Sequence, residues 1–301
     1  MMTGLLNLTE RNIKLFFKDK GMFFSSLITP VILLVLYVTF LADVFRDSFV
    51  SALPKGLKVA DSLINATVGG ELVSSILAVC CVTVSFCSNL LMIQDKVTGA
   101  RKDITVTPVK RSTLALSYFL ASAATTMIIS FTGLFICLLY LSKTGWYLSA
   151  SDVFLLILDV VLLTLFGVSL SSCVNFFLST NGQASAVGTI VSAGYGFICG
   201  AYMPISSFSE GLQKLLSFLP GTYGTSLIRN HALRGVYREM YEKGFPTEVV
   251  EAIKDSIDCN IYFSGSKVGI PSMYIILAGA GLLFTALYVL LNIMSGRKNN
   301  V

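Results

Sequence analysis

Polar side chains inside long apolar runs are the first residues of this 301-residue sequence that could do chemistry. Asp159 follows the apolar stretch 155–158, and a carboxylate at membrane depth costs a few kcal/mol unless it has a partner or a function. Asn89 and Tyr195 also lie in such runs. We therefore predict Asn89, Asp159 and Tyr195 as candidates for a substrate path. Two alternatives stay open, because Asp159 can reach headgroups or neutralise a neighbour and Asn89 can bond between helices.

A second concentration of polar residues lies at 95–112, between two apolar runs. This segment reads DKVTGARKDITVTPVKRS. This linker is longer than two antiparallel helices require. It also has an internal apolar rhythm in Val97, Ile104 and Val106. A solvated connector is one interpretation, but the rhythm favours a short helix that docks on a partner.

Small residues recur at every fourth position of the run 183–202, at Ala184, Gly188, Ser192, Gly196 and Gly200. A face of small side chains lets two backbones approach closely, which is how helices associate in lipid. The pattern predicts a tightly packed helix. It leaves open whether the neighbour belongs to the same chain or to a second copy.

Several kinds of chemistry have no support in the sequence. It contains no G-x-x-x-x-G-K-[ST] loop for ATP phosphates, no H-E-x-x-H and no G-x-S-x-G. A single histidine, His231, and cysteines without a CxxC pair do not suggest a metal site. The basic residues form no stripe with aromatics of the kind that binds nucleic acid. A membrane-embedded enzyme would need a polar cluster at one depth, and only Asp159 suggests one.

The elements that position these residues follow from composition. The chain is 54% apolar and 13% charged, with a mean hydropathy of +0.76, whereas a soluble domain has about 25% charged residues. A spanning helix needs about 20 mostly apolar residues. We predict an all-α integral membrane protein with six transmembrane helices, at about 22–42, 69–94, 113–141, 153–178, 183–202 and 270–294.

Amphipathic segments flank these spans. In residues 1–21 Phe16 and Phe17 share one helical face and Lys14 and Lys18 the other, which predicts an interfacial helix facing anionic membrane lipid. A plain cytoplasmic helix is the alternative. In the segment 203–269, an apolar face over 208–219 is too short to span and predicts an interfacial or re-entrant helix. We expect the polar remainder to form a small exterior cap.

Orientation follows from Lys and Arg in short loops, which favour the cytoplasmic side. These residues concentrate in the N-terminal segment, in 95–112 and in the C-terminal tail. With six spans all three lie on one side, so both termini are predicted to be cytoplasmic. The basic residues of 203–269 do not oppose this, because long loops cross largely regardless of charge.

With these elements, the sequence resembles the ABC-2-type permeases of ATP-binding cassette exporters over essentially its whole length. The resemblance rests on the amphipathic N-terminal segment, on the stretches 200–204 and 218–223, and on an acidic–Gly–hydrophobic–Thr-Pro-x-x-Arg pattern, here Asp95, Gly99, Ile104, Thr107, Pro108 and Arg111. The family often has Glu where this chain has Asp95. The exterior segment after Tyr223 is longer than in compact members.

The resemblance implies a bacterial plasma-membrane location, two permease subunits, which are two copies or a copy and a homologue, and separate ABC ATPase subunits that hold ATP and Mg²⁺. This chain itself would bind no cofactor. It also implies that residues 95–112 form a coupling loop with a helix seated on the ATPase, and that the turn 179–182 is a second contact. The residues expected to couple are Asp95, Val97, Gly99, Arg101, Lys102, Thr107 and Pro108.

The substrate class is less constrained. Polysaccharide exporters of this family tend to line a wide channel with aromatic residues, and the aromatics here form no clear ladder. We therefore expect export of drugs or antimicrobial peptides by alternating access. The alternatives are a lipid or polysaccharide exporter, and a non-transporting sensor or immunity protein that binds a ligand at residues 222–267.

Overall fold

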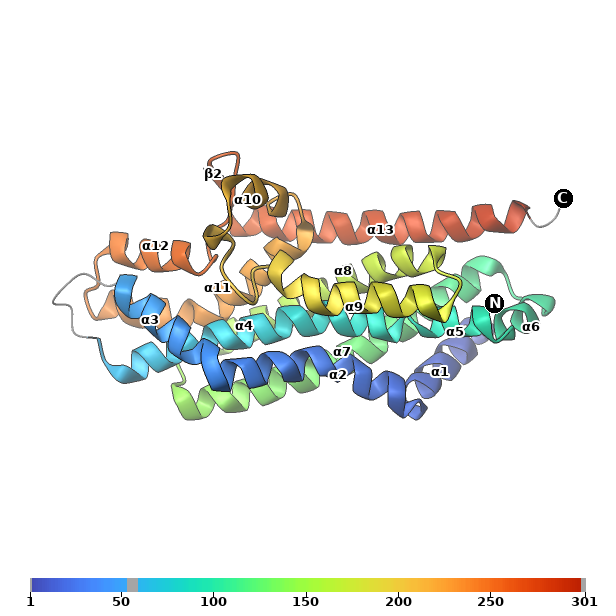
Figure 1. The fold of residues 1–301 in the computed structure, drawn as a ribbon, viewed down its shortest axis with the longest axis horizontal. Coiled ribbons are helices and arrows are strands. Elements are labelled where there is room, and N and C mark those ends of the chain that lie inside the picture. The colour runs from blue at the N-terminus through green and yellow to red at the C-terminus, as the bar shows by residue number, and fades with distance from the viewer. Residues whose placement is uncertain (1, 53–58, 299–301) are drawn as a thin grey trace.

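The computed structural model of the chain describes residues 2–52 and 59–298 and shows an elongated bundle of helices that lie roughly side by side (Figure 1). The predicted all-α class is confirmed, with a two-stranded hairpin as a small addition. α1 (Met2–Lys18), α6 (Ala100–Val106) and the C-terminal end of α13 (Ile270–Lys298) lie at one end of the bundle. α3 (Ala42–Ala52) and α12 (Thr247–Ser256) lie at the other.

Five helical stretches of the described chain are long and apolar enough to cross a membrane: Lys20–Asp47, Asp61–Val97, Arg111–Thr144, Ala150–Phe177 and Ile270–Ser295. They coincide with five of the six predicted spans. The remaining predicted span, 183–202, forms α9 (Asn181–Ile198), which does not reach the same length and apolarity. The count of six spans therefore stays a prediction.

The first span is longer than predicted. Asp19 caps α2 (Lys20–Leu36) by accepting a hydrogen bond from the Met22 N–H at 3.0 Å, which separates α2 from α1. The helix then passes through a π-helical turn, η1 (Tyr37–Leu41), into α3. The predicted end at residue 42 is thus an internal position of a continuous helix.

α4 (Asp61–Ser88) is the central helix of the bundle, and most of its side chains are buried. It packs against α2, α7 (Arg111–Thr144), α8 (Ala150–Phe177) and α9, which is why its apolar residues cover all of its faces. Close approach to α8 depends on Gly167, where a Cβ atom would lie 2.9 Å from Ser85 Oγ. After a break at Asn89 and Leu90, the chain continues as α5 (Leu91–Val97).

The exterior segment differs most from the prediction. After η2 (Ile205–Ser207) and the short α10 (Glu210–Leu216), the chain forms α11 (Pro220–Glu242). This helix is buried against α4, α8 and α13 and is not part of a small polar cap. The prediction was wrong because the polar side chains of α11, such as Arg229 and His231, find partners inside the protein. α12 and the hairpin of β1 (Tyr262–Phe263) and β2 (Ser266–Lys267) complete the segment.

Candidate functional site: a lateral groove and a coupling segment

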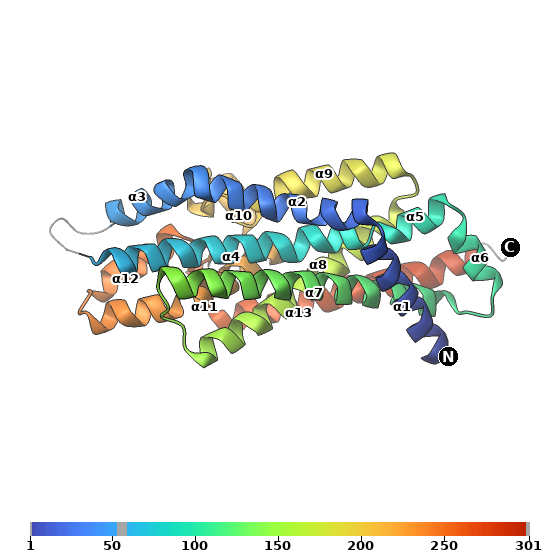
Figure 2. The same cartoon turned by 90° about the horizontal axis from the view of Figure 1, so that it is seen from below.

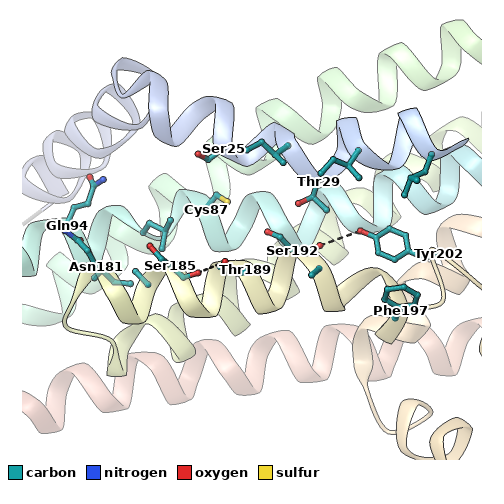
Figure 3. Close-up of a pocket in the computed structure, with 18 of the residues that line it drawn as sticks. Ser25, Thr29, Cys87, Gln94, Asn181, Ser185, Thr189, Ser192, Phe197 and Tyr202 are labelled. Carbon is teal, nitrogen blue, oxygen red and sulfur yellow. Dashed lines mark hydrogen bonds between the residues drawn. The ribbon is translucent and has the colours of Figure 1, made fainter. Parts of the chain in front are cut away.

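A groove of about 1230 Å³ opens on the side of the bundle between α2 and α9, above α4 and α5. Figure 2 shows that α2 and α9 lie on the same side of α4, so together they form two walls over a common floor. Residues from all four helices and from the turn after α9 line it (Figure 3): Ser25, Ile28, Thr29, Ile32, Leu36, Phe40, Leu41, Cys87, Leu90, Ile93, Gln94, Val97, Thr98, Asn181, Ala184, Ser185, Gly188, Thr189, Ser192, Ala193, Phe197, Tyr202 and Met203.

The two walls of the groove differ in chemistry, and among the described residues no lining side chain carries a formal charge. The α2 wall is mainly apolar, with Ile28 and Ile32 exposed. The α9 wall presents Ser185, Thr189 and Ser192, whose spacing of four and three residues places them on one helical face. The hydroxyl of Thr189 donates to the Ser185 carbonyl at 2.9 Å. The groove is therefore amphipathic and neutral.

Two aromatic side chains, Phe197 and Tyr202, lie together at the end of the groove formed by the last turn of α9 (Figure 3). Tyr202 folds back over α9, and its ring lies edge-on to Phe197 with the centroids 5.0 Å apart. Its hydroxyl points to the Ser192 carbonyl oxygen at 3.5 Å. The ring occupies the space above Gly196, where a Cβ atom would lie 2.3 Å from it. Figure 3 shows Phe197 and Tyr202 at the end of the groove opposite Gln94 and Asn181, and Phe40 is a further aromatic residue of the lining.

The small residues of α9 have three different surroundings. At Gly196 the expected close packing is present, but the neighbour is Tyr202 of the same chain. Ala184 is buried near the opposite end, while Gly188 has no atom of another described element within 4 Å of a Cβ position. Gly200 lies beyond the helix with φ +73, so it forms the turn and does not pack a helix face.

None of the three residues predicted for a substrate path lines this groove. Asn89 lies at the break between α4 and α5 and faces α8, where its Nδ2 donates to Ser171 Oγ at 2.9 Å and Ser172 Oγ at 2.7 Å. This is the interhelical bonding foreseen as its alternative. Tyr195 is buried, with its hydroxyl against Gly221 and without a partner among the described residues.

Asp159 is bonded inside the bundle, where α8, α11 and α13 meet. Its Oδ2 lies 2.6 Å from His231 Nδ1, and its Oδ1 accepts a hydrogen bond from the Tyr274 hydroxyl at 2.5 Å. Asp159 and His231 are both buried. Of the interpretations of Asp159, the one in which it pairs with a neighbour therefore agrees with the structure. Nothing in the sequence spacing identified His231 as that neighbour, since 72 residues separate the two.

The predicted coupling segment contains the expected short helix, α6, which is set off from α5 by Gly99 with φ +85. Only a glycine adopts this left-handed conformation without strain. Val97, Lys102, Thr107 and Pro108 are exposed at this end of the bundle, while Arg101 is half-buried and donates to Asn292 Oδ1 at 3.4 Å. Their role in contacting an ATPase stays a prediction.

Asp95 occupies a different position from the other predicted coupling residues. It is only 4% exposed, and its carboxylate accepts hydrogen bonds from both Arg11 Nη atoms, at 2.8 and 3.1 Å, and from the Tyr118 hydroxyl at 2.5 Å. The bond to Asp95 raises the pKa of the Arg11 guanidinium further. The Asp95 side chain thus joins α5 to α1 and α7 and is not available for a partner protein.

Lys96 has a role that the sequence analysis missed. Its Nζ donates to the carbonyl oxygens of Asn175, Phe176 and Leu178, at 3.3, 2.7 and 2.6 Å. Asn175 and Phe176 belong to the last turn of α8 and Leu178 is its C-cap, so these carbonyls lie at the negative end of the helix dipole. The Asn175 carbonyl also accepts a hydrogen bond from the Leu178 N–H at 3.2 Å. Lys96 therefore fixes the turn that leads from α8 into α9. A basic residue in a polar loop has no sequence signal for such a partner 79–82 residues away.

A model of the family described as ABC-2 type transporter matches residues 3–232. A search of curated proteins finds no match to the chain. The matched region contains both walls and the floor of the groove, the coupling segment, and α11 as far as Ala232. Because the match covers most of the sequence and the fold holds apolar helices long enough to cross a membrane, the chain belongs to the ABC-2 type transporter family and is the membrane permease part of an ABC transporter, which works with an ABC ATPase.

Proposed function

We propose that this permease exports small amphipathic molecules, either drugs or antimicrobial peptides, across a bacterial plasma membrane by alternating access. The neutral groove between α2 and α9 is the observation that carries the proposal. Its apolar wall suits the apolar part of such a molecule, and the hydroxyls of Ser185, Thr189 and Ser192 suit its polar groups. A substrate whose charge had to be desolvated here would find no counter-charge among the lining residues.

The distribution of aromatic residues argues against the polysaccharide alternative. Phe40, Phe197 and Tyr202 are the aromatic residues of the described lining, and its other side chains are aliphatic, hydroxyl-bearing, amide or sulfur-containing. A sugar chain passing through would need stacking surfaces at regular intervals. Phe86 and Tyr195, on the neighbouring helices α4 and α9, are buried within the bundle and do not line the groove.

A second permease copy would close the groove. The groove is open to the side, and Gly188 in its α9 wall leaves space for a closely approaching backbone. We infer that two copies, or a copy and a homologue, face each other across their grooves and enclose the substrate path between them.

The energy source in this proposal is a separate ATPase that holds ATP and Mg²⁺ and contacts α6 and the turn 179–182. Val106 of α6 is 87% exposed, which is unusual for a valine and suits a buried contact with another protein. α1, α6 and the C-terminal end of α13 share one end of the bundle, which we assign to the cytoplasm (Figure 1). ATP-driven closure of the ATPase would favour one permease state over the other, as in any population shift.

Transport in proteoliposomes tests the groove. The protein would be reconstituted with the ATPase that co-purifies from its host, and uptake of a fluorescent amphipathic drug into inside-out vesicles would be followed. Thr189→Asp introduces a charge into the groove, and we expect at least about a tenfold loss of transport rate because a desolvated charge is costly. Thr189→Asn is the matched control, because it has nearly the shape of Thr189→Asp without the charge and still offers a polar group, and it should retain most activity. Equal rates for Thr189→Asp and the wild type would exclude the groove as the path.

Co-purification tests the coupling surface separately. Val106→Asp combined with Lys102→Glu should reduce the amount of ATPase bound, because an exposed apolar contact and a positive charge are both lost. Glu242→Gln, at the opposite end of the bundle, is the control and should leave the amount unchanged. If the α6 variant binds the ATPase as well as the wild type does, the coupling assignment is wrong.

A further inference from the structure

A small cavity lies where α1 packs across α7, beside α4 and α5 (Figure 2). Its volume is about 10 Å³, and it shares no lining residue with the groove. Residues of all four helices line it: Asn12, Phe16, Ser88, Leu91, Tyr118, Ala121, Ser122 and Thr125. A polar cavity of about 10–15 Å³ is large enough for a single water molecule and too small for an organic ligand.

The Asn12 amide provides an independent indication of a ligand. Asn12 is 1% exposed, and its Nδ2 atom is buried and has no hydrogen-bond partner among the described residues. Its Oδ1 accepts a hydrogen bond from Arg11 Nη1 at 2.8 Å. Because a guanidinium group can only donate, this bond fixes the orientation of the amide and leaves Nδ2 as the donor without an acceptor. Buried N–H groups in native proteins almost always have an acceptor, either from the protein or from ordered water.

Acceptors for a bridging ligand lie on α7. Ser122 and Thr125 are three residues apart and share one face of this helix. The Thr125 hydroxyl donates its proton to the Ala121 carbonyl at 2.8 Å, and its oxygen keeps lone pairs that can accept a hydrogen bond. The cavity thus has an N–H donor on α1 and hydroxyl oxygens on α7. A ligand that joins them must accept one hydrogen bond and donate others.

The chemistry of the lining distinguishes water from an ion. A metal cation is repelled by an N–H donor, which is the group that lacks a partner here. An anion would lie close to the Asp95 carboxylate, which accepts a hydrogen bond from Tyr118 of the cavity lining. We propose that the cavity binds a single water molecule, which accepts a hydrogen bond from Asn12 Nδ2 and donates to the hydroxyl oxygens of Ser122 and Thr125.

The bound water adds a polar link between α1 and the rest of the bundle. Arg11 joins α1 to Asp95 of α5, and the Tyr118 hydroxyl joins Asp95 to α7. Asn12 follows Arg11 directly, so the water lies beside these bonds and connects α1 to α7 without a charge. A water molecule can turn toward new partners, so this link can persist when α1 shifts against α7. The site does not depend on the substrate proposed above.

A substitution that fills the cavity tests the proposal by the sign of its effect. Ser122→Val displaces a bound water and leaves Asn12 Nδ2 without an acceptor, so we expect the thermal unfolding midpoint in detergent to fall by about 2–6 °C. In a dry cavity, the added methyl groups would instead improve packing and raise the midpoint. Ser142→Val, at an exposed position of the same helix, is the matched control for the change in helix propensity. It should leave the midpoint within about 1 °C of the wild type.

The Asn12→Ala background separates the water from other effects of the valine. Without the amide no N–H group is left unbonded, so Ser122→Val should no longer lower the midpoint there. A crystal or cryo-EM map of the wild type at about 2 Å resolution or better should also show one peak about 2.7–3.2 Å from Asn12 Nδ2, and none in Ser122→Val.

Four results would overturn the proposal. They are a higher midpoint for Ser122→Val than for the wild type, an equal fall of the midpoint with and without the Asn12 amide, a wild-type map without a peak in the cavity, and an anomalous signal at that peak in crystals soaked in bromide. The last result would assign the site to an anion. The map needs no variant, so a variant that fails to fold leaves the proposal open to refutation.

Discussion

Around the groove between α2 and α9, the lining residues carry no charge and Gly188 has open space beside it. Around α11, by contrast, ionisable side chains are buried and hydrogen-bonded. Arg229 is held by the carbonyls of Ile257 and Gly200, at 2.6 and 2.9 Å, and His231 by Asp159. The buried polar groups near α11 fix one arrangement of the helices that pack against α11, because any displacement leaves a polar group without its hydrogen-bond partner. Within the described residues, no charged side chain ties one wall of the groove to the other, so its walls can change their neighbours at low cost.

Removal of the Arg229 side chain should have the largest effect on stability, because it removes the central buried charge of the α11 region. Arg229→Met leaves Asp258 buried without a counter-charge. It also leaves the carbonyls of Gly200 and Ile257 without their donor. Breaking a buried pair in this way costs about 3–5 kcal/mol, so we expect a large fall in the thermal unfolding midpoint in detergent. Arg234→Met on the same helix is the control, because the Arg234 side chain is 54% exposed. Equal midpoints for the two variants would contradict the comparison.

The pair Asp159–His231 should show strong coupling in a double-mutant cycle. Each single change to alanine leaves the other group buried and without its partner. The double variant should therefore lose less stability than the sum of the two, by about 0.5–3 kcal/mol. Chemical unfolding of the purified protein provides the measurement. Additive losses would mean that the 2.6 Å contact contributes nothing to stability.

Two glycine substitutions compare the regions directly. At Gly235 of α11 a Cβ atom would lie 1.9 Å from the Tyr147 carbonyl oxygen, so Gly235→Ala forces the backbones apart and should cost about 1–3 kcal/mol. At Gly188 of α9 no described neighbour lies within 4 Å, so Gly188→Ala should raise stability by up to about 1 kcal/mol through helix propensity. Thermal unfolding of the isolated permease distinguishes the two. If cross-linking shows that Gly188→Ala loses the permease dimer and Gly235→Ala does not, the result would support a second permease copy that packs on the groove.

The smallest expected effect concerns the hairpin of β1 and β2. Salt bridges to Lys254 and Lys267 lower the pKa of Glu251 to about 2. Because the pKa in the folded state is depressed, the stabilisation is complete above the unfolded value near 4.5 and is lost as the pH falls toward 2. The backbone amides of residues 261–267 should therefore lose protection against hydrogen exchange in that range, measured relative to the exchange rate of an unstructured chain at the same pH. Glu251→Gln should remove the pH dependence, and an unchanged profile in that variant would contradict the assignment.

The sequence predicted well those elements whose signal is local. Five spans follow from apolar runs, and α6 follows from the spacing of apolar residues around Gly99. The beginning of α4 was missed by eight residues, because the positions 61–68 are not apolar enough to suggest a span. Packing against α3 and α11 keeps this part of the chain helical.

The site was less predictable, because its walls come from distant parts of the chain. Thr29 and Thr189 face one groove although 160 positions separate them. The spacing of Ser185, Thr189 and Ser192 was a usable signal for a hydroxyl-bearing face, but the same helix also carries small residues at every fourth position, a pattern that predicts helix packing. The burial of α11 could not be inferred from its polar composition, since the partners of Arg229 include Ser74 and Gly200.

Asp95 and Lys96 are consecutive residues, yet their side chains extend to different parts of the bundle. Asp95 is bonded to Arg11 of α1, which leads directly into α2, one wall of the groove. Lys96 is bonded to the end of α8, which leads directly into α9, the other wall. Both walls are therefore anchored to the same seven-residue helix, α5. A single displacement of that helix is transmitted to both sides at once, so the two walls need no separate signal to move in concert.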